Sequence, residues 1–175
     1  SLSRVSEVGG YTESGHSQRV SRLALAVGAE MGMSEAQLDD LRYAALMHDI
    51  GQLSLPDRIP SGATSMVSSE EQRRIASLGA EVVRQTGVLD RVALIVECQA
   101  EPYRRPGEPL DAGIPLASRI IRVVNAYDDH VGGSLDSERR LFALERLRGG
   151  MAFDYDPRVV ETLGRVVERT MLLNA

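Results

Sequence analysis

The sequence predicts an all-α protein that forms one compact bundle of about seven helices. Apolar residues recur every three or four positions along most of the 175 residues, and no segment shows sustained alternation of apolar and polar side chains. Glycine and proline fall between the periodic segments, where they begin or end helices. At this length, and with 43% hydrophobic residues, the chain can bury the core of a single domain.

The first half of the chain predicts three helices after a polar beginning. Residues 1–13 are polar and contain glycine, so we expect a linker there and a domain over residues 14–175. The three helices are expected at residues 14–31, 34–49 and 68–86. The second and the third begin with capping boxes, formed by Ser34 with Gln37 and by Ser68 with Glu71.

The second half predicts four more helices. Their expected positions are residues 88–99, 115–130, 137–148 and 157 to near the end of the sequence. Pro115 is expected as the first residue of its helix, and Asp156 as the N-cap of the last one. The intervening stretch of residues 101–115 is rich in proline and glycine and predicts an irregular loop.

Composition and charge exclude several classes of protein. The net charge is −5 and all 20 basic residues are arginines without a basic block, which argues against general nucleic-acid binding. No apolar run approaches membrane-spanning length, and no secretory signal is visible. The single cysteine, Cys98, cannot form an internal disulfide, which fits the cytoplasmic location that we expect.

An adjacent histidine and aspartate, His48 and Asp49, end the second predicted helix just before Gly51. Imidazole nitrogens and carboxylate oxygens are ligands that divalent transition metals take. His16 lies one turn before Val20 on an apolar stripe, so its side chain is expected to point inward toward the same core. A late helix adds the polar residue Asn125 to this set.

Five blocks in this order resemble the HD phosphohydrolase superfamily, and most closely its HD-GYP branch, over most of the chain. The blocks are GHSQRV at 15–20, AALMHDIG at 44–51, IPLASRI at 114–120, VVNAYD at 123–128 and FDYDP at 153–157. The resemblance implies an HD-domain helical bundle for signal transduction, whose active members hydrolyse cyclic di-GMP with two or three metal ions, often iron or manganese. It also implies a residual metal site at His16, His48, Asp49 and Asn125, with Asp49 as the catalytic residue if the domain is active.

The chain departs from that branch at several ligand positions. Gln52 replaces a lysine that would hold phosphate, Ile75 replaces a histidine, and residues 97–99 lack the paired histidines of the branch. Asn125 replaces an aspartate, and its neutral amide oxygen is a poorer metal ligand than a carboxylate. Because the whole chain has three histidines, a histidine-rich site for two or three metals cannot be assembled.

These losses favour a degenerate signalling domain without cyclic di-GMP phosphodiesterase activity, which acts as a regulatory or interaction module. The alternative is a phosphohydrolase with one divalent metal, iron, manganese or another, that acts on a nucleotide or another phosphoester. A third interpretation keeps the ligand residues only as a hydrogen-bonded core network without metal. The expected partners are other signalling domains or proteins, or a cyclic dinucleotide or nucleotide.

Four residues are candidates for binding a substrate or an anion. They are Gln52, Arg104, Arg105 and Asp128. The two arginines stand where the branch has its Gly-Tyr-Pro motif, and the alternative interpretation for them is a solvated loop. We expect Asp129 to be a solvated surface charge and Arg119 to pair with an acidic neighbour.

Overall fold

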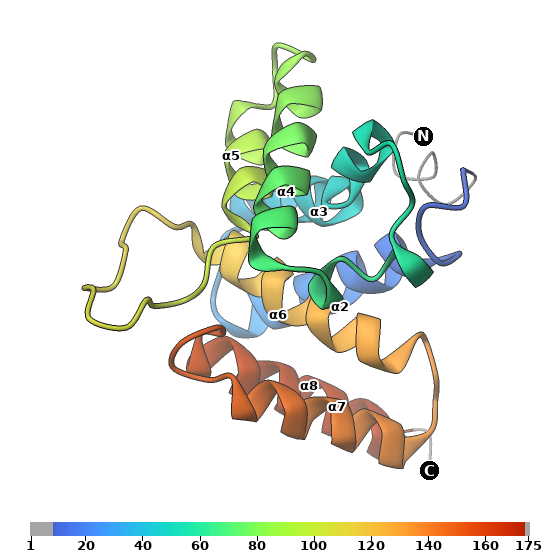
Figure 1. Ribbon diagram of the computed structural model, residues 1–175. Coiled ribbons are helices and arrows are strands. Elements are labelled where there is room, and N and C mark those ends of the chain that lie inside the picture. Colours follow the sequence, from blue (N-terminus) through green and yellow to red (C-terminus); the bar gives the residue numbers. More distant parts are fainter. Residues whose placement is uncertain (1–8, 174–175) are drawn as a thin grey trace.

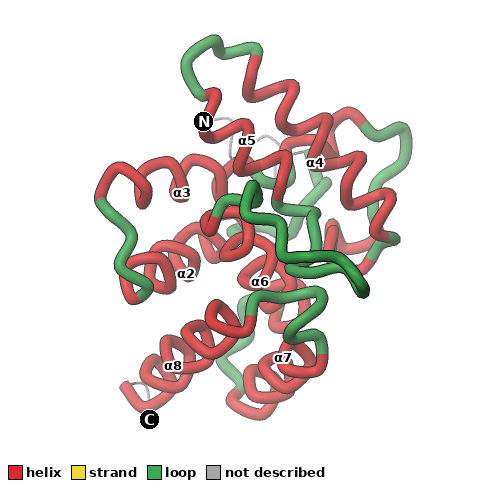
Figure 2. The backbone as a smooth tube through the Cα atoms, turned by 90° about the vertical axis from the view of Figure 1, so that its left-hand side faces the viewer, coloured by secondary structure: helices red, strands yellow, loops and turns green. Residues whose placement is uncertain are grey.

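The computed structural model describes residues 9–173, which form seven α-helices joined by turns, loops and three short 3-10 helices (Figures 1 and 2). The elements are α2 (His16–Glu30), α3 (Glu35–Met47), η2 (Ile50–Ser54), η3 (Pro60–Gly62), η4 (Thr64–Met66), α4 (Ser69–Arg84), α5 (Asp90–Cys98), α6 (Leu116–Val131), α7 (Ser137–Gly149) and α8 (Pro157–Leu173). The prediction of an all-α bundle is confirmed. Within the described range, no helix combines the length and apolarity needed to cross a bilayer.

Helix α6 lies at the centre of the bundle. Figure 1 shows α4 and α5 on one side of it and α7 and α8 on the other, and α2 packs along it. Most α6 side chains are buried, including the apolar Ile120, Ile121, Val123 and Val124. Because α6 is covered on nearly all sides, its polar residues Asn125 and Asp128 lie in the interior of the molecule.

The helix ends follow the predicted capping signals, with two corrections. Ser34 and Gln37 form both bonds of a capping box. At the predicted second box, the Ser68 side chain accepts the backbone N–H of Glu71, but the Glu71 side chain does not bond back to the Ser68 N–H, so only half of the box is formed. Asp156 caps the last helix, since its Oδ1 atom accepts the backbone N–H of Arg158 at 3.0 Å. Pro115 is the N-cap rather than the first helical residue, because its ψ of 144° is extended and the helix begins at Leu116.

The irregular stretch after α3 brings η2 onto α4. Gly51 makes this approach possible, because a Cβ atom there would lie 2.0 Å from the carbonyl oxygen of Ile75 and 2.7 Å from the backbone nitrogen of Gly79. These two atoms belong to the backbone of α4 and cannot move aside cheaply. The glycine therefore fixes how the chain leaves Asp49.

The predicted boundary at residue 13 falls partly outside the described residues, because residues 1–8 are not described. Of the rest, Thr12 is buried and Glu13 is exposed and pairs with Arg19 through a 2.8 Å contact between Oε2 and Nη2. A domain that starts at residue 14 stays a prediction.

Candidate metal centre

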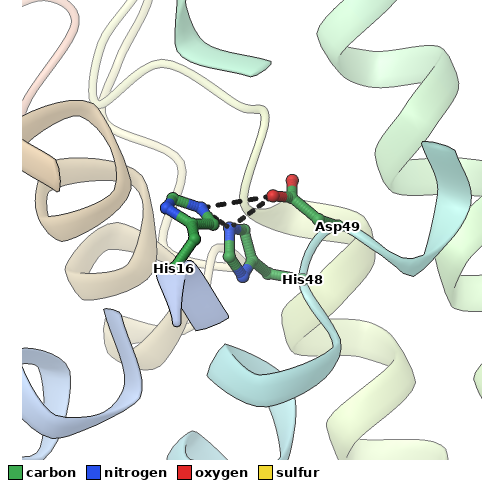
Figure 3. A group of neighbouring side chains, drawn as sticks. All are labelled: His16, His48 and Asp49. Atoms are coloured by element: carbon green, nitrogen blue, oxygen red, sulfur yellow. Dashed lines mark hydrogen bonds and ion pairs between the residues drawn. The ribbon is translucent and has the colours of Figure 1, made fainter. Parts of the chain in front are cut away.

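Three side chains from two helix ends converge at the core of the bundle (Figure 3). His16 comes from the first turn of α2, while His48 caps the C-terminus of α3 and Asp49 follows it. The two Nε2 atoms of the histidines lie 3.2 Å apart, and Asp49 Oδ2 lies 3.3 Å from that of His16 and 3.2 Å from that of His48. All three residues are at most 4% exposed. The inward direction predicted for His16 is confirmed.

Asn125 extends this triangle from α6. Its Oδ1 atom lies 3.1 Å from His48 Nε2. His130 lies near the end of α6 and borders a different cavity, with Phe142 and Arg146 on α7. The structure thus brings together the four predicted ligands His16, His48, Asp49 and Asn125.

The contacts of the histidine Nδ1 atoms determine what their Nε2 atoms can do. His48 Nδ1 lies 2.8 Å from the carbonyl oxygen of Ala45, which can only accept, so Nδ1 carries the proton. His16 Nδ1 lies 2.8 Å from Asp128 Oδ2 and donates in the same way. In neutral rings, both Nε2 atoms therefore present lone pairs to each other and to Asp49.

This arrangement requires a cation at its centre, either protons or a metal ion. Asp49 Oδ2 is buried and accepts no hydrogen bond of good geometry within residues 9–173. Ligands bound to one ion at about 2.1 Å lie about 3.0–3.4 Å from one another, a range that includes the separations among His16, His48 and Asp49. The donor set therefore fits a divalent transition metal.

The electrostatics of the cluster point to the same need. Burial alone would lower the pKa of His16, but the carboxylates of Asp128 and Asp49 outweigh it and raise the pKa to about 10. Against the same effect of burial, the Asp49 carboxylate raises the pKa of His48. Burial disfavours the charged form of Asp49, yet the two imidazoles hold its pKa below the usual range. Without metal, protons supply the positive charge that a metal ion would bring.

Each candidate ligand also has a partner that orients it. Asp128 holds His16 and in turn accepts Arg19 Nε–H at 2.9 Å. The hydroxyl group of Thr64 donates to Asp49 Oδ1 at 3.1 Å and accepts from Asn125 Nδ2 at 2.9 Å. Such outer contacts fix the rotamers and the basicity of metal ligands.

Two cavities adjoin the centre. The smaller, of about 50 Å³, is lined by His48 and Asp49 together with Ile75, Gln99 and Arg122. The larger, of about 510 Å³, opens on the other side at His16, Asp128 and Asp129.

Arg122 is a cation at the smaller cavity that our sequence reasoning missed. Its guanidinium group is largely buried and donates from Nη1 to the carbonyl oxygen of Ala100 at 2.9 Å and from Nε to that of Asp154 at 3.0 Å. Burial lowers its pKa. Its position one helical turn before Asn125 on α6 was the available signal, because residues three apart share a helix face.

Three of the predicted substrate-binding residues lie away from the two cavities. Gln52 is completely buried and donates its amide to the carbonyl oxygen of Gly62 at 3.2 Å. Arg104 and Arg105 are exposed on the loop that projects between α5 and α6 in Figure 1, where Arg105 pairs with Glu101. Of the four candidates, only Asp128 reaches the centre, through its contact with His16.

Asp129 is not the solvated surface charge that the sequence predicted. The 3-10 helix η4 packs against α6, and the backbone N–H of Ser65 donates to Asp129 Oδ2 at 3.0 Å. The side chain is half-buried, and burial raises its pKa to about 6, with a further contribution from the charge of Asp49. The expected acidic partner of Arg119 is confirmed as Asp156, 3.5 Å away.

The chain belongs to the HD domain family, whose model matches residues 11–159. This match covers α2 to the start of α8 and includes every residue of the candidate metal centre. The resemblance to HD phosphohydrolases predicted from the sequence is thereby confirmed.

Two curated relatives share less than half of their length with this chain. A cyclic di-GMP phosphodiesterase of Thermotoga maritima is 28% identical over 158 residues, which cover 83% of this chain and 42% of the relative. The cyclic di-GMP phosphodiesterase response regulator RpfG of Xanthomonas campestris pv. campestris is 27% identical, with 94% of this chain and 47% of the relative covered.

Two solved structures share the fold. A cyclic GMP-AMP specific phosphodiesterase of V. cholerae superposes with a TM-score of 0.68 at 21% identity, covering 90% of this chain and 45% of that one. The HD domain of the L. monocytogenes phosphodiesterase PgpH, solved with cyclic-di-AMP, gives a TM-score of 0.62 at 17% identity, covering 97% and 94%. The helical arrangement described above is that of HD phosphodiesterase domains.

Proposed function

We propose that this HD domain binds one divalent transition metal ion and acts as a regulatory module that does not hydrolyse cyclic di-GMP. His16, His48 and Asp49 would hold the ion, with Asn125 as a fourth ligand. The observation that carries the proposal is the different environment of the two Asp49 oxygens. Oδ2 faces the two imidazoles, whereas Oδ1 accepts a hydrogen bond from the hydroxyl group of Thr64.

A second metal ion would need the other oxygen of Asp49 and further ligands near it. The smaller cavity beside Asp49 offers Ile75, whose side chain is apolar, and Gln99, whose amide donates to the backbone oxygen of His48 at 2.7 Å. Among residues 9–173, His48 and Asp49 are the only imidazole, carboxylate or thiolate groups that line that cavity. In the part of the chain that the structure describes, the smaller cavity therefore offers no further side chain of these kinds to a second ion, which a paired-metal reaction would need to stabilise the leaving oxygen while the first ion activates water.

The two cavities beside the centre differ in what they could hold. Sites for drug-sized ligands typically measure about 300–1,000 Å³; the space next to His48 and Asp49, at about 50 Å³, is far below that range, whereas the cavity at His16, at about 510 Å³, lies within it. The relatives are phosphodiesterases of cyclic di-GMP, and this supports a role in the same kind of signalling. That role would use the retained fold and metal site rather than turnover.

Arg122 favours a second candidate, a phosphohydrolase with a single metal. A metal ion supplies Lewis acidity and an activated water at neutral pH. Arg122 would bind a phosphoryl oxygen through its Nη2 group, whose contact with Asp154 Oδ1 is long at 4.0 Å. The small cavity would admit a terminal phosphate group, so the substrate would be a phosphomonoester.

Metal analysis tests the proposed centre. Protein purified without chelator and reloaded with Mn²⁺ or Fe²⁺ is expected to hold one ion per chain by mass spectrometry. The His48→Ala variant is expected to hold none, and the His130→Ala variant, which alters the histidine outside the centre, is expected to match wild type. Two ions per chain would overturn the single-metal proposal, and an empty site at millimolar metal would overturn metal binding.

Turnover assays separate the two candidate functions. The loaded protein is expected to leave cyclic di-GMP intact, and cleavage that His48→Ala abolishes would overturn the regulatory proposal. Release of phosphate from a phosphomonoester such as p-nitrophenyl phosphate, lost in both His48→Ala and Arg122→Ala, would favour the phosphohydrolase instead.

A further inference from the structure

A third cavity, whose lining includes none of the four candidate metal ligands, lies between α2, α6, α8 and the connection from α6 to α7. Its volume is about 320 Å³, within the range of small-molecule sites. Its apolar walls are formed by Leu23, Ala26, Val131, Leu135, Val166 and Val167. Leu135 is 75% exposed, so part of this apolar wall faces solvent.

Three arginines also line this cavity, and their charge is only partly compensated. Arg19 is occupied by Asp128 and Glu13. Arg140 uses Nε for the carbonyl oxygen of Ser134, and Arg22 has no hydrogen bond or ion pair within residues 9–173. Asp128, the acidic residue of this lining, is already neutralised by Arg19 and His16. The cavity is therefore positive, although the chain as a whole carries a net charge of −5.

Tyr127 adds an unused hydrogen-bond donor to the same cavity. Its ring is buried at the core, and its hydroxyl group makes no hydrogen bond within the described part of the chain. Burial raises the pKa of this phenol to about 12, so it stays protonated at neutral pH and can donate.

We infer that this cavity binds a small organic anion with an apolar body, of the class of medium-chain carboxylates. The carboxylate would pair with Arg22 and Arg140, whose planar guanidinium groups match its two oxygens. The alkyl chain would lie against Leu23, Val131 and the valines of α8. Charged arginines beside an apolar wall select such a molecule over a neutral alcohol or a short, fully hydrated anion.

Binding of a carboxylate in this cavity would also change the metal affinity of the candidate centre. This consequence rests on the proposed function. Arg19 and Asp128 line this cavity, and Asp128 is the residue that orients His16. A carboxylate that drew Arg19 away from Asp128 would leave a stronger charge on the partner of His16. The cavity would then regulate metal affinity through the contacts Arg19–Asp128–His16.

Calorimetric titration of the whole chain with octanoate and decanoate, below their micelle concentrations, tests the site. We expect saturable binding with one site per chain, and binding weaker by about tenfold or more in the double variant Arg22→Glu/Arg140→Glu. Arg74→Glu, an exposed arginine on α4 outside the cavity, is the matched control and should bind like wild type. Decanol and acetate should not saturate.

Several results would overturn the site. They are equal binding by the double variant, equal binding of decanol, no saturable binding to wild type, and association with lipid vesicles in place of the free acid. Circular dichroism of each variant shows that loss of binding is not loss of fold. The coupling has its own test, because saturating decanoate should change the apparent Mn²⁺ affinity about fivefold or more in wild type and not in the double variant. Unchanged affinity would overturn the coupling alone, and failure of Mn²⁺ to bind without decanoate would overturn only the proposed function.

Discussion

The two oxygens of Asp49 face environments that differ in chemistry and in completeness. Around Oδ2, His16 and His48 each present a ring nitrogen, and each is oriented by a second contact, with Asp128 or with the carbonyl oxygen of Ala45. Around Oδ1, the hydroxyl group of Thr64 satisfies the carboxylate. The Oδ2 side thus presents ligand atoms of the kind that a cation takes, whereas the Oδ1 side is satisfied by a neutral hydroxyl group.

On the Oδ2 side of Asp49, the candidate metal ligands are present together with the contacts that orient them. Such contacts orient metal ligands, but buried polar groups in a core without metal need hydrogen-bond partners as well. What distinguishes the two cases is Asp49 Oδ2, which is buried without a hydrogen bond of good geometry within residues 9–173. On the other side, Ile75 packs as a buried apolar residue, 2% exposed. The contrast favours a domain that keeps one metal site over a domain in which all ligands persist as structural residues.

The largest expected effect is a loss of stability on substitution of Gly51, because this glycine lets the chain that follows Asp49 pack directly against the backbone of α4. In Gly51→Ala, the new Cβ atom would meet backbone atoms at 2.0 and 2.7 Å, so α4 and η2 must separate. We expect the free energy of unfolding to fall by at least about 3 kcal/mol in urea titrations. Gly149→Ala, at a glycine with no atom within 4 Å of its would-be Cβ, should stay near wild type. Equal stability of the two variants would contradict the close approach.

Substitution of Asp128 is expected to have a smaller effect, which changes the affinity for metal rather than the stability of the fold. In the wild type, the Asp128 carboxylate orients His16 and raises the basicity of its ring. Asp128→Asn removes this negative charge. Metal affinity should fall by about 10–100-fold, measured by competition with a chelating dye. Asp40→Asn, which alters an aspartate on α3 that pairs with Arg91, is the control. Affinity unchanged in Asp128→Asn would place His16 outside the ligand set.

The Thr64→Val variant tests the surroundings of Asp49 Oδ1. This change leaves Asp49 Oδ1 and Asn125 Nδ2 buried without their shared partner, and should cost about 1–3 kcal/mol of the free energy of unfolding. The metal content should remain one ion per chain, because Ile75 and Gln99 still provide no ligand. Thr86→Val, at an exposed threonine, serves as the control for loss of a hydroxyl group. Uptake of a second ion by Thr64→Val would mean that the hydroxyl group alone excluded it.

The helices of this fold were predictable because their signals are local. Apolar periodicity, glycine and proline placed each α-helix of the described range within a few residues, and Ser34 and Asp156 marked their caps correctly. The error at Pro115 is of one residue, because a proline's φ suits both an N-cap and a first turn.

The site was predictable only where a helix carries it. His16, His48 and Asn125 lie on or at the ends of periodic helices, so their inward direction followed from neighbouring apolar residues. Thr64 begins the short 3-10 helix η4 and contacts Asn125 across 61 residues of sequence, a contact that no local pattern encodes. The prediction for Asp129 was wrong for the same reason, since the turn that covers it comes from η4.

The smallest effect distinguishes the neighbours Asp128 and Asp129 by the sign of their pH dependence. Burial raises the pKa of Asp129 from 3.8 to about 6, so its contribution to stability is full below pH 3.8 and is lost as pH rises through 6. In metal-free protein, wild type should therefore lose about 1–2 kcal/mol relative to Asp129→Asn between pH 4 and 7, allowing for partial exposure. Although burial opposes it, the contacts with His16 and Arg19 lower the pKa of Asp128, so its contribution is lost in the opposite direction, as pH falls. Urea unfolding between pH 4 and 7 measures the change for Asp129, and the change for Asp128 requires measurements below pH 3.8. Parallel profiles for wild type and Asp129→Asn between pH 4 and 7 would show that Asp129 remains solvated.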